Sequence, residues 1–238
     1  DHERRAAIRR NHTATHLLHW ALREVLGEHV KQQGSLVAPD RLRFDFSHFE
    51  AVTADQIRAI EDLVNADVLD NTPVHHFETT KAAATELGAI AFFGEKYGDL
   101  VRVLEAGPHS TELCGGTHVG RTGDIGPTKI VSETSIGSNL RRIEAITGFG
   151  PIERIRREED ELAAASERIG VPRPELLDGI DKRLAELRDL RAEVKALKAK
   201  LATGGAADLA AGATGGAVVA RVDGLARDDL RSLAVAVR

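Results

Sequence analysis

Apolar residues recur at helical spacing in two long segments near the start of the chain. Residues 3–26 place apolar and histidine side chains on one face, and Gly27 follows as a stop signal. Residues 53–71 begin with Thr53 and Gln56 in capping-box spacing and continue with an apolar stripe. The two faces carry Ile8, His12, His16, His19, Val25 and Leu26 in the first segment, and Ile57, Ile60, Leu63, Val64 and Val68 in the second. Both segments predict long amphipathic helices.

Alternation of apolar and polar residues predicts strands in the segments that follow. In LRFDFSH, residues 42–48, Leu42, Phe44 and Phe46 alternate with polar residues, which is typical of a half-buried strand. Further strands are predicted for VHHFET after Pro73 and near residues 100–104, 128–131 and 140–147, with a short helix KAAATELG closed by Gly88. This order of elements predicts an α+β domain, in which helices pack on a mainly antiparallel sheet.

The pattern changes after TGFGP, residues 147–151. Beyond this break Glu, Arg, Ala and Leu dominate, and leucines recur mostly three and four residues apart. Leu184, Leu187 and Leu190 run three and then three apart, which would overwind a coiled coil locally, so we favour a helical arm or hairpin over a regular zipper. At about 1.5 Å per residue, residues 174–201 would reach about 40 Å.

The sequence therefore divides into four predicted parts. Residues 1–150 form the α+β domain, and residues 151–202 form the helical arm. Residues 203–216, TGGAADLAAGATGG, have too little apolar bulk for a core and predict a flexible linker. Residues 217–238 predict a strand, a turn and a helix, the start of a further domain. The lack of any Met and the unfinished C-terminal pattern indicate an excised piece of a longer protein.

Composition and charge narrow the classes of protein. The 238 residues are 42% hydrophobic and carry a formal net charge of −5, so the chain can bury a core and has no overall basic field typical of nucleic-acid binding. No apolar run approaches the roughly 18 to 20 residues of a membrane helix, and no signal peptide is present, so we expect a cytoplasmic protein that enters no membrane. The single cysteine excludes an internal disulfide and leaves metal ligation, catalysis or burial.

Two histidines at helical spacing are the first candidate metal ligands. His12 and His16 are at positions i and i+4 of the first predicted helix, so both imidazoles project from one face. The pair alone is weak evidence, because histidines at this spacing more often pack in a core or face solvent. His19 lies near the same face, and we interpret it as packed under the site or donating to a residue around it.

The only cysteine supplies two further candidate ligands with a neighbouring histidine. Cys114 and His118 bracket Gly115 and Gly116, and the glycines allow a short loop to fold so that both side chains face inward and support the site. Two nitrogen donors from a helix with a sulfur and a nitrogen from a loop make a tetrahedral set suited to zinc. A Cys114 nucleophile beside His118 is the competing interpretation, although nothing nearby resembles a protease motif.

These motifs lie in a sequence that resembles the editing domain of alanyl-tRNA synthetase along residues 5–150. The resemblance is carried by RRNHTATHLLHWALREVLGEHVKQQGSLVAPDRLRFDFSH, by VNADVLDNTPV and by FGEKYGDLVRVLEAGPHSTELCGGTHVGRTGDIGPTKIVSETSIGSNLRRIEAITG. Free-standing editing proteins and threonyl-tRNA synthetase share the HxxxH and CxxxH pairs, whereas the flanking residues and the arm point to the alanyl enzyme. The arm and tail resemble the connection to, and the start of, its C-terminal domain.

The resemblance implies a zinc-dependent deacylase with the aminoacyl-tRNA editing domain fold. Its reaction would be hydrolysis of the ester that joins serine or glycine to the terminal adenosine of tRNA(Ala). A synthetic site shaped for alanine excludes these amino acids only weakly, by about 1 to 3 kcal/mol, so a second sieve is needed. The parent enzyme ligates alanine to its tRNA with ATP in a part missing from this chain. A homodimer through its C-terminal region is a candidate assembly.

Two residues are candidates for recognising the serine hydroxyl. Thr15 precedes His16 and faces the site from the same turn, and Gln32 occupies the position of the family's pocket glutamine. Thr15 could instead bond back to its helix, and Gln32 could cap a turn. Arg141 and Arg142 are candidates for phosphate contacts or for a solvated strand edge. No side-chain general base is evident, so we expect zinc to position and polarise the substrate.

Two other functions stay open at the level of the sequence. One is a non-catalytic module in which zinc only staples the fold and the arm serves tRNA docking or dimerisation. The other is a free-standing trans-editing deacylase, which predicts a chain that begins with Met and lacks the arm. This sequence begins with Asp1 and carries a predicted arm.

Overall fold

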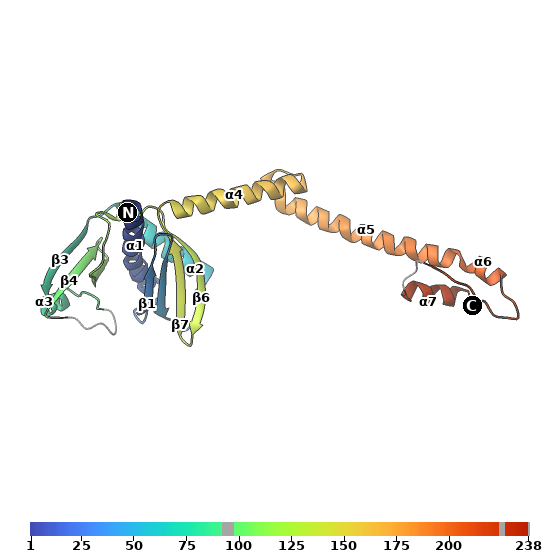
Figure 1. Cartoon of the computed structure of the whole chain (residues 1–238), viewed down its shortest axis with the longest axis horizontal. Helices are drawn as coiled ribbons and strands as arrows, with labels where there is room; N and C mark the ends of the chain where they lie inside the picture. Colours follow the sequence, from blue (N-terminus) through green and yellow to red (C-terminus); the bar gives the residue numbers. More distant parts are fainter. Residues whose placement is uncertain (92–97, 224–226, 238) are drawn as a thin grey trace. The chain divides into compact units, whose positions relative to one another are not determined.

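The computed structural model describes residues 1–91, 98–223 and 227–237, and the chain divides into two compact units, residues 1–158 and 159–238 (Figure 1). The part of the FGEKYGDL stretch at residues 93–97 and the part of the predicted tail at residues 224–226 lie outside the described residues. Within the described part, no helix combines the length and apolarity that crossing a bilayer requires.

Both long N-terminal helices form where their patterns predict them. Helix α1 (His2–Leu26) begins at Asp1, whose carboxylate accepts a hydrogen bond from the Arg4 backbone N–H. Helix α2 (Ala54–Asp70) begins at a complete capping box, because Thr53 and Gln56 each bond the other's backbone N–H through their side chains. The starts of both helices are thus encoded locally.

The strands form two antiparallel sheets, a four-stranded one in the order β1-β2-β7-β6 and a three-stranded one in the order β3-β4-β5. Their bounds are β1 (Gln32–Val37), β2 (Leu42–Ser47), β3 (Val74–Thr80), β4 (Leu100–Ala106), β5 (Ser110–Leu113), β6 (Lys129–Gly137) and β7 (Leu140–Ile146). The short helix α3 (Lys81–Glu86) follows β3, and a 3₁₀ turn, η1 (Thr122–Ile125), precedes β6. The predicted α+β class is confirmed. Strands β1 and β5 were not predicted, since β1 is mostly exposed or half-buried and β5 has only four residues.

Helix α1 contacts both sheets and lies between them in Figure 1. Its residues Leu17, Leu18 and Leu22 are fully buried in the main core, together with Phe44 and Phe46 of β2. The same helix contacts β4 and β5 of the smaller sheet. Because α1 is held by the two sheets, polar side chains on it are placed against the end of β5.

Helices make up most of the described residues of the second unit. Helix α4 (Phe149–Ile169) runs across the boundary at residue 158, and a 3₁₀ turn, η2 (Arg173–Glu175), leads into α5 (Leu176–Gly204). Most of residues 151–202, where a helical arm is predicted, therefore lies in α4 and α5. The apolar stripe of α5, Leu184, Leu187, Leu190, Val194, Leu197 and Leu201, is about half exposed or more.

The tail of the chain departs from its expected local structure. Helix α6 (Ala206–Ala211) forms inside the stretch expected to be a flexible linker, since it is rich in alanine, the strongest helix former. The predicted strand is not formed in the described residues 217–223, whereas the predicted helix is present as α7 (Arg227–Ala236). The division of this unit into linker and further domain stays a prediction.

Candidate metal centre

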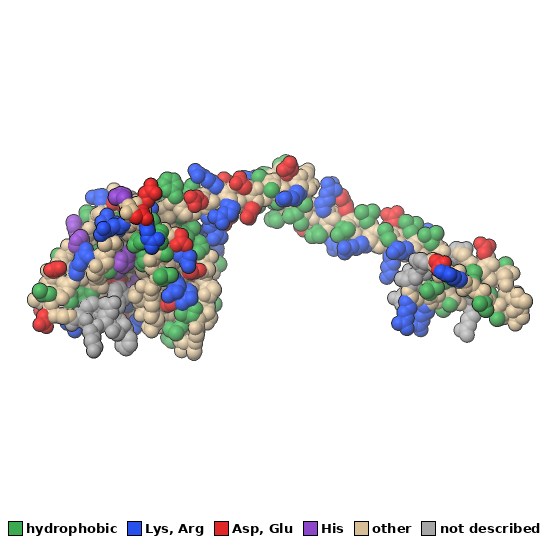
Figure 2. Space-filling view, viewed as in Figure 1, with side chains coloured by type: hydrophobic (Ala, Val, Ile, Leu, Met, Phe, Trp, Pro, Cys, Tyr) green, Lys and Arg blue, Asp and Glu red, His purple; other side chains and the backbone are tan. Residues whose placement is uncertain are grey.

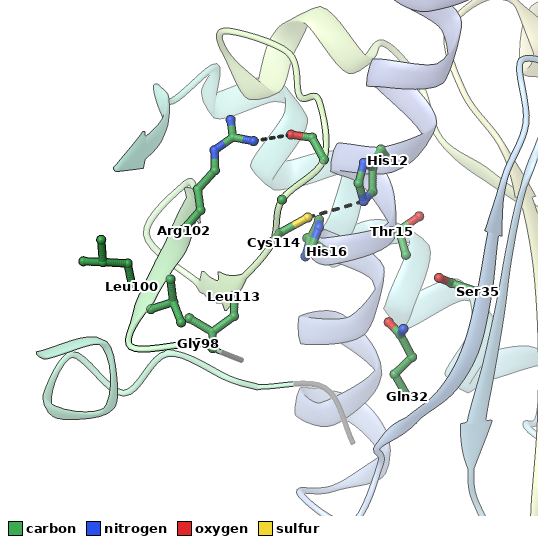
Figure 3. A pocket seen from close by; sticks show the side chains of 13 residues that line it. His12, Thr15, His16, Gln32, Ser35, Gly98, Leu100, Arg102, Leu113 and Cys114 are labelled. Carbon is green, nitrogen blue, oxygen red and sulfur yellow. Dashed lines mark hydrogen bonds between the residues drawn. The ribbon is translucent and has the colours of Figure 1, made fainter. Parts of the chain in front are cut away.

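The two predicted ligand pairs come together at one point in the first unit. His12 and His16 come from α1, and Cys114 and His118 come from the loop that follows β5. One ligand atom of each residue lies within 4.8 Å of the other three. Figure 3 shows Cys114 and His12 directed at one another, with His16 beside them. The fold thus joins residues that are about a hundred positions apart.

The spacing of the donor atoms matches a tetrahedral ion. The Cys114 Sγ atom lies 3.5 Å from His12 Nε2 and 3.3 Å from His118 Nε2. Zinc with standard bonds of about 2.3 Å to sulfur and about 2.0 Å to nitrogen, at tetrahedral angles, sets its sulfur and nitrogen ligands about 3.5 Å apart. His16 is buried and the other three residues are half-buried. One thiolate and three imidazoles are donors that suit zinc, and the two sulfur–nitrogen distances match its geometry.

The loop after β5 is shaped by one of its two glycines. A Cβ atom on Gly116 would lie 2.0 Å from Cε1 of His12, so only glycine fits against that ring. The Gly116 carbonyl also accepts a hydrogen bond of 2.6 Å from Arg102 Nη1, drawn in Figure 3. A Cβ on Gly115 would have no atom within 4 Å, and neither glycine has a positive φ. The loop thus needs glycine at position 116 because His12 approaches closely. The sequence had suggested a different reason, the backbone freedom of both glycines.

A threonine orients His118. The Thr13 hydroxyl donates to the Arg9 carbonyl at 2.9 Å, so its oxygen accepts from the Val119 backbone N–H at 3.2 Å and from His118 Nδ1 at 3.3 Å. With Nδ1 protonated, His118 presents its Nε2 lone pair toward Cys114. Thr13 was not singled out in the sequence, since nothing in its local pattern shows the contact with a loop 105 residues away.

A buried glutamate contacts His16 from the side away from the cluster. Glu112 is 1% exposed; its Oε2 accepts from His16 Nδ1 and its Oε1 lies 2.7 Å from His19 Nδ1. His19 is therefore one residue removed from the donor set, which agrees with its interpretation as a residue around the site. Glu112 was missed by the sequence analysis. The signal for it was its place on β5, two positions before the candidate ligand Cys114.

The contacts fix the charges of the metal-free cluster. Burial raises the pKa of the Glu112 carboxyl, but the nearby His16 outweighs it and brings that pKa down to about 2. Burial lowers the pKa of His16, but Glu112 outweighs it and raises that pKa to about 10. Burial likewise opposes the Cys114 thiolate, yet hydrogen bonds from His118, His12 and His16 lower its pKa to about 3. Burial lowers the pKa of His118 to about 4. Cys114 is thus a thiolate, the form that binds metal.

The donor cluster opens into a cavity of about 490 Å³. Two predicted recognition residues line it, Thr15 from α1 and Gln32 from β1, and Ser35 lies beside them (Figure 3). The Thr15 hydroxyl donates to the Asn11 carbonyl at 2.8 Å, which leaves its oxygen able to accept. Further lining comes from Arg102, Leu113, Cys114, Gly115 and Gly116. Three of the four candidate ligands, His12, His16 and Cys114, therefore share one cavity with the candidate recognition residues.

The two arginines proposed for phosphate contacts are paired within the four-stranded sheet. Arg141 binds Glu133 through two nitrogens at 2.5 and 2.7 Å, and Arg142 binds Asp45 at 2.7 and 2.8 Å. Such bidentate pairs occupy the donors that a phosphate would use. Charges of both signs are also interspersed on the face shown in Figure 2. These contacts favour a structural role for both residues, and their contact with tRNA stays a prediction.

Comparison with known proteins shows which sequences this chain is similar to. Residues 101–144 match the family described as Threonyl and Alanyl tRNA synthetase second additional domain. The chain is 53% identical over 213 residues to an alanine–tRNA ligase of Xanthomonas campestris pv. campestris (strain 8004), which covers 90% of this chain. The resemblance to alanyl-tRNA synthetase is confirmed. A ligase of Xanthomonas axonopodis pv. citri (strain 306) is also 53% identical, over 211 residues. The chain spans only 24% of the length of these ligases.

Proposed function

We propose that this chain is the editing module of an alanyl-tRNA synthetase, which hydrolyses the ester of tRNA(Ala) mischarged with serine or glycine. The observation that carries the proposal is that three residues of the donor cluster, His12, His16 and Cys114, line one cavity together with Thr15 and Gln32. Its volume of about 490 Å³ lies within the range of small-ligand sites, about 300 to 1,000 Å³. An amino acid with its esterified ribose belongs to that size class.

Selection of serine over alanine follows from the polar groups of the cavity. Thr15 retains acceptor capacity, and no hydrogen bond to the Gln32 side chain is found among the described residues. A serine hydroxyl can pair with such groups, whereas alanine would leave them desolvated and unpaired at a cost of about 1 to 3 kcal/mol. The cavity therefore suits a sieve that accepts serine and rejects alanine.

The residues of the chain would position the ester. No side chain is evident as a general base for the attacking water. Zinc held by His12, His16, Cys114 and His118 would supply a Lewis acid that polarises an oxygen of the substrate. Both oxygens of Glu112 are engaged by His16 and His19, so this carboxylate is not placed to accept a proton from water. Arg102 holds the loop by its bond to Gly116 and presents a cation at the cavity wall.

The test is single-turnover deacylation of tRNA(Ala) charged with serine, glycine or alanine, with zinc content measured in parallel. We expect turnover of the serine and glycine esters by the zinc-loaded chain and its loss in Cys114→Ala. Gln32→Ala should keep zinc and lower discrimination between serine and alanine by about fivefold to 150-fold, the equivalent of 1 to 3 kcal/mol. Glu78→Gln is the matched control, since this exposed carboxylate on β3 does not line the cavity.

A zinc-loaded, folded chain that leaves all three esters at their spontaneous rate of hydrolysis would refute the proposal. That outcome would favour a zinc staple without chemistry, because four protein ligands are typical of structural zinc sites.

The wider roles belong to the same proposal. Residues 151–202 would be the arm that precedes the C-terminal domain, and the protein would act in the cytoplasm on tRNA(Ala). Alanine ligation with ATP, and homodimer formation through the C-terminal region, would belong to the complete enzyme, since the chain spans about a quarter of the similar ligases.

A further inference from the structure

We propose that Glu112 is the positioning residue of the metal centre: its two carboxylate oxygens hold Nδ1 of His16 and Nδ1 of His19, and thereby fix the tautomer and orientation in which His16 presents Nε2 to the ion. The inference rests on the metal centre of the proposed function. It assigns a role to a residue that neither ligates the ion nor lines the cavity.

The role follows from the chemistry of the contacts. An ionised carboxylate only accepts hydrogen bonds. The two nitrogens that face Glu112, Nδ1 of His16 and Nδ1 of His19, must therefore each carry a proton. A neutral imidazole with a proton on Nδ1 has its lone pair on Nε2. Because Nδ1 of His16 faces Glu112, Nε2 is the atom that His16 offers to the cluster, whose ligand atoms all lie within 4.8 Å of one another. A carboxylate behind a metal-binding histidine is a common way to orient such a ligand.

The fold places Glu112 for this contact. Glu112 lies on β5 and Cys114 follows the strand directly, and the contacts of both side chains with histidines of α1 show that both face this helix. On α1, His12, His16 and His19 follow one another at intervals of four and three and lie on one face. The two faces meet in register: Cys114 is beside His12, and Glu112 is between His16 and His19.

Glu112 has a second role, because its carboxylate balances the charge of the zinc-loaded site. A zinc ion with the Cys114 thiolate would leave one net positive charge in a largely buried site if all histidines are neutral. The carboxylate of Glu112, 1% exposed, brings the sum to zero. Buried charges are stable in proteins only when they are compensated nearby. Glu112 therefore holds His16 and also lowers the electrostatic energy of the occupied site.

The experiment measures the zinc dissociation constant of the chain by competition with a chromophoric chelator. Glu112→Gln keeps the size of the side chain, but an amide has one oxygen and one NH₂ group and cannot accept from both histidines. We expect Glu112→Gln and Glu112→Ala to weaken zinc binding by about 10-fold to 100-fold, the usual effect of losing such a partner. Glu78→Gln, an exposed carboxylate on β3 of the same sheet, is the matched control and should bind zinc as the unaltered chain does.

A pair of His19 variants tests the role of the contact between Glu112 Oε1 and His19. The pair also replaces the Glu112 variants as the test if those fail to fold. His19→Asn retains an N–H donor near the position of Nδ1, whereas His19→Leu removes it at similar volume. We expect zinc affinity near that of the unaltered chain for His19→Asn and about tenfold weaker binding for His19→Leu. Nitrogen-15 NMR of the zinc-loaded chain should show the His16 proton on Nδ1.

The outcomes separate this inference from the function on which it rests. If Glu112 only supported the fold, its substitution would lower the stability of the metal-free chain and leave zinc affinity unchanged. Zinc binding by Glu112→Gln as tight as by Glu78→Gln, or a His16 proton on Nε2, would overturn the inference and leave the metal centre intact. An unaltered chain that binds no zinc would instead overturn the metal centre itself.

Discussion

The two glycines of the loop after β5 should respond in opposite ways to the same added methyl group. In Gly116→Ala the new Cβ would lie 2.0 Å from Cε1 and 2.5 Å from Nδ1 of His12, where ordinary contacts begin at 3.4 Å. The ring or the loop must therefore move by about 1.4 Å, the difference between 3.4 and 2.0 Å. Metal–ligand distances tolerate only about 0.2 Å. The displacement is several times larger, so we expect His12 to be lost as a ligand.

The expected magnitudes follow from that loss. Gly116→Ala should weaken zinc binding by more than about a hundredfold, beyond the effect of losing a residue that only orients a ligand. Overpacking should also destabilise the metal-free chain by about 1 to 3 kcal/mol. Gly115→Ala should leave zinc affinity unchanged and stabilise the chain by about 0.4 to 1 kcal/mol, because its backbone needs no positive φ and its Cβ meets no atom.

Chelator competition gives the two zinc dissociation constants, and urea unfolding with and without zinc gives the two stabilities. Gly116→Ala that binds zinc as tightly as Gly115→Ala would refute the reasoning, since the His12 ring would then not occupy the space against Gly116. Equal weakening in both variants would also contradict it, because it would make general loop flexibility, and not the single close approach, the property that matters.

Three further predictions concern residues outside the donor set. Thr13→Val should weaken zinc binding by about tenfold, because His118 loses the acceptor of its Nδ1 proton, and Thr13→Ser should restore it; chelator competition measures both. Asn11→Ala should lower the free energy of unfolding in urea by about 1 to 3 kcal/mol, since the buried Asn11 amide donates to two carbonyls of the turn after β1. The pKa of Asp67 is raised by burial, against the opposing charge of His109, so the native state binds its proton more tightly than the unfolded state and stability should fall as pH rises above about 4. Asp67→Asn should lack that fall and be more stable than the unaltered chain at pH 7, as urea unfolding across this pH range would show.

Much of the fold was predictable because its signals are local. Thr53 and Gln56, which bond each other across three positions, determine the start of α2. The alternation of Phe44 and Phe46 with polar residues predicts β2. Strand β5 was not predictable in this way. Its four residues are too few for a period to emerge, and they form a strand because β4 offers them backbone partners.

In the candidate site, too, only the residues with a local sequence signal could be predicted. The four donors were predictable, since His12 with His16 and Cys114 with His118 are each ligand pairs at short spacing. Neither Thr13 nor Glu112 could be assigned, because each acts on a residue about a hundred positions away, at 105 and 96 positions respectively. Short spacing identifies ligands, whereas the groups that orient them are identified only when the strands and helices are placed.

A single buried carboxylate near a metal-binding motif can nevertheless be sought in a sequence by a physical rule. A glutamate two residues before a ligand on a short strand shares the ligand's face, and a helix with histidines at intervals of four and three offers it two partners. Glu112 satisfies both conditions, and within residues 1–91, 98–223 and 227–237 its charged partners are His16 and His19, so the site itself compensates its charge. The pattern ExC facing HxxxHxxH therefore predicts a charge-balanced metal site more specifically than the four ligands alone.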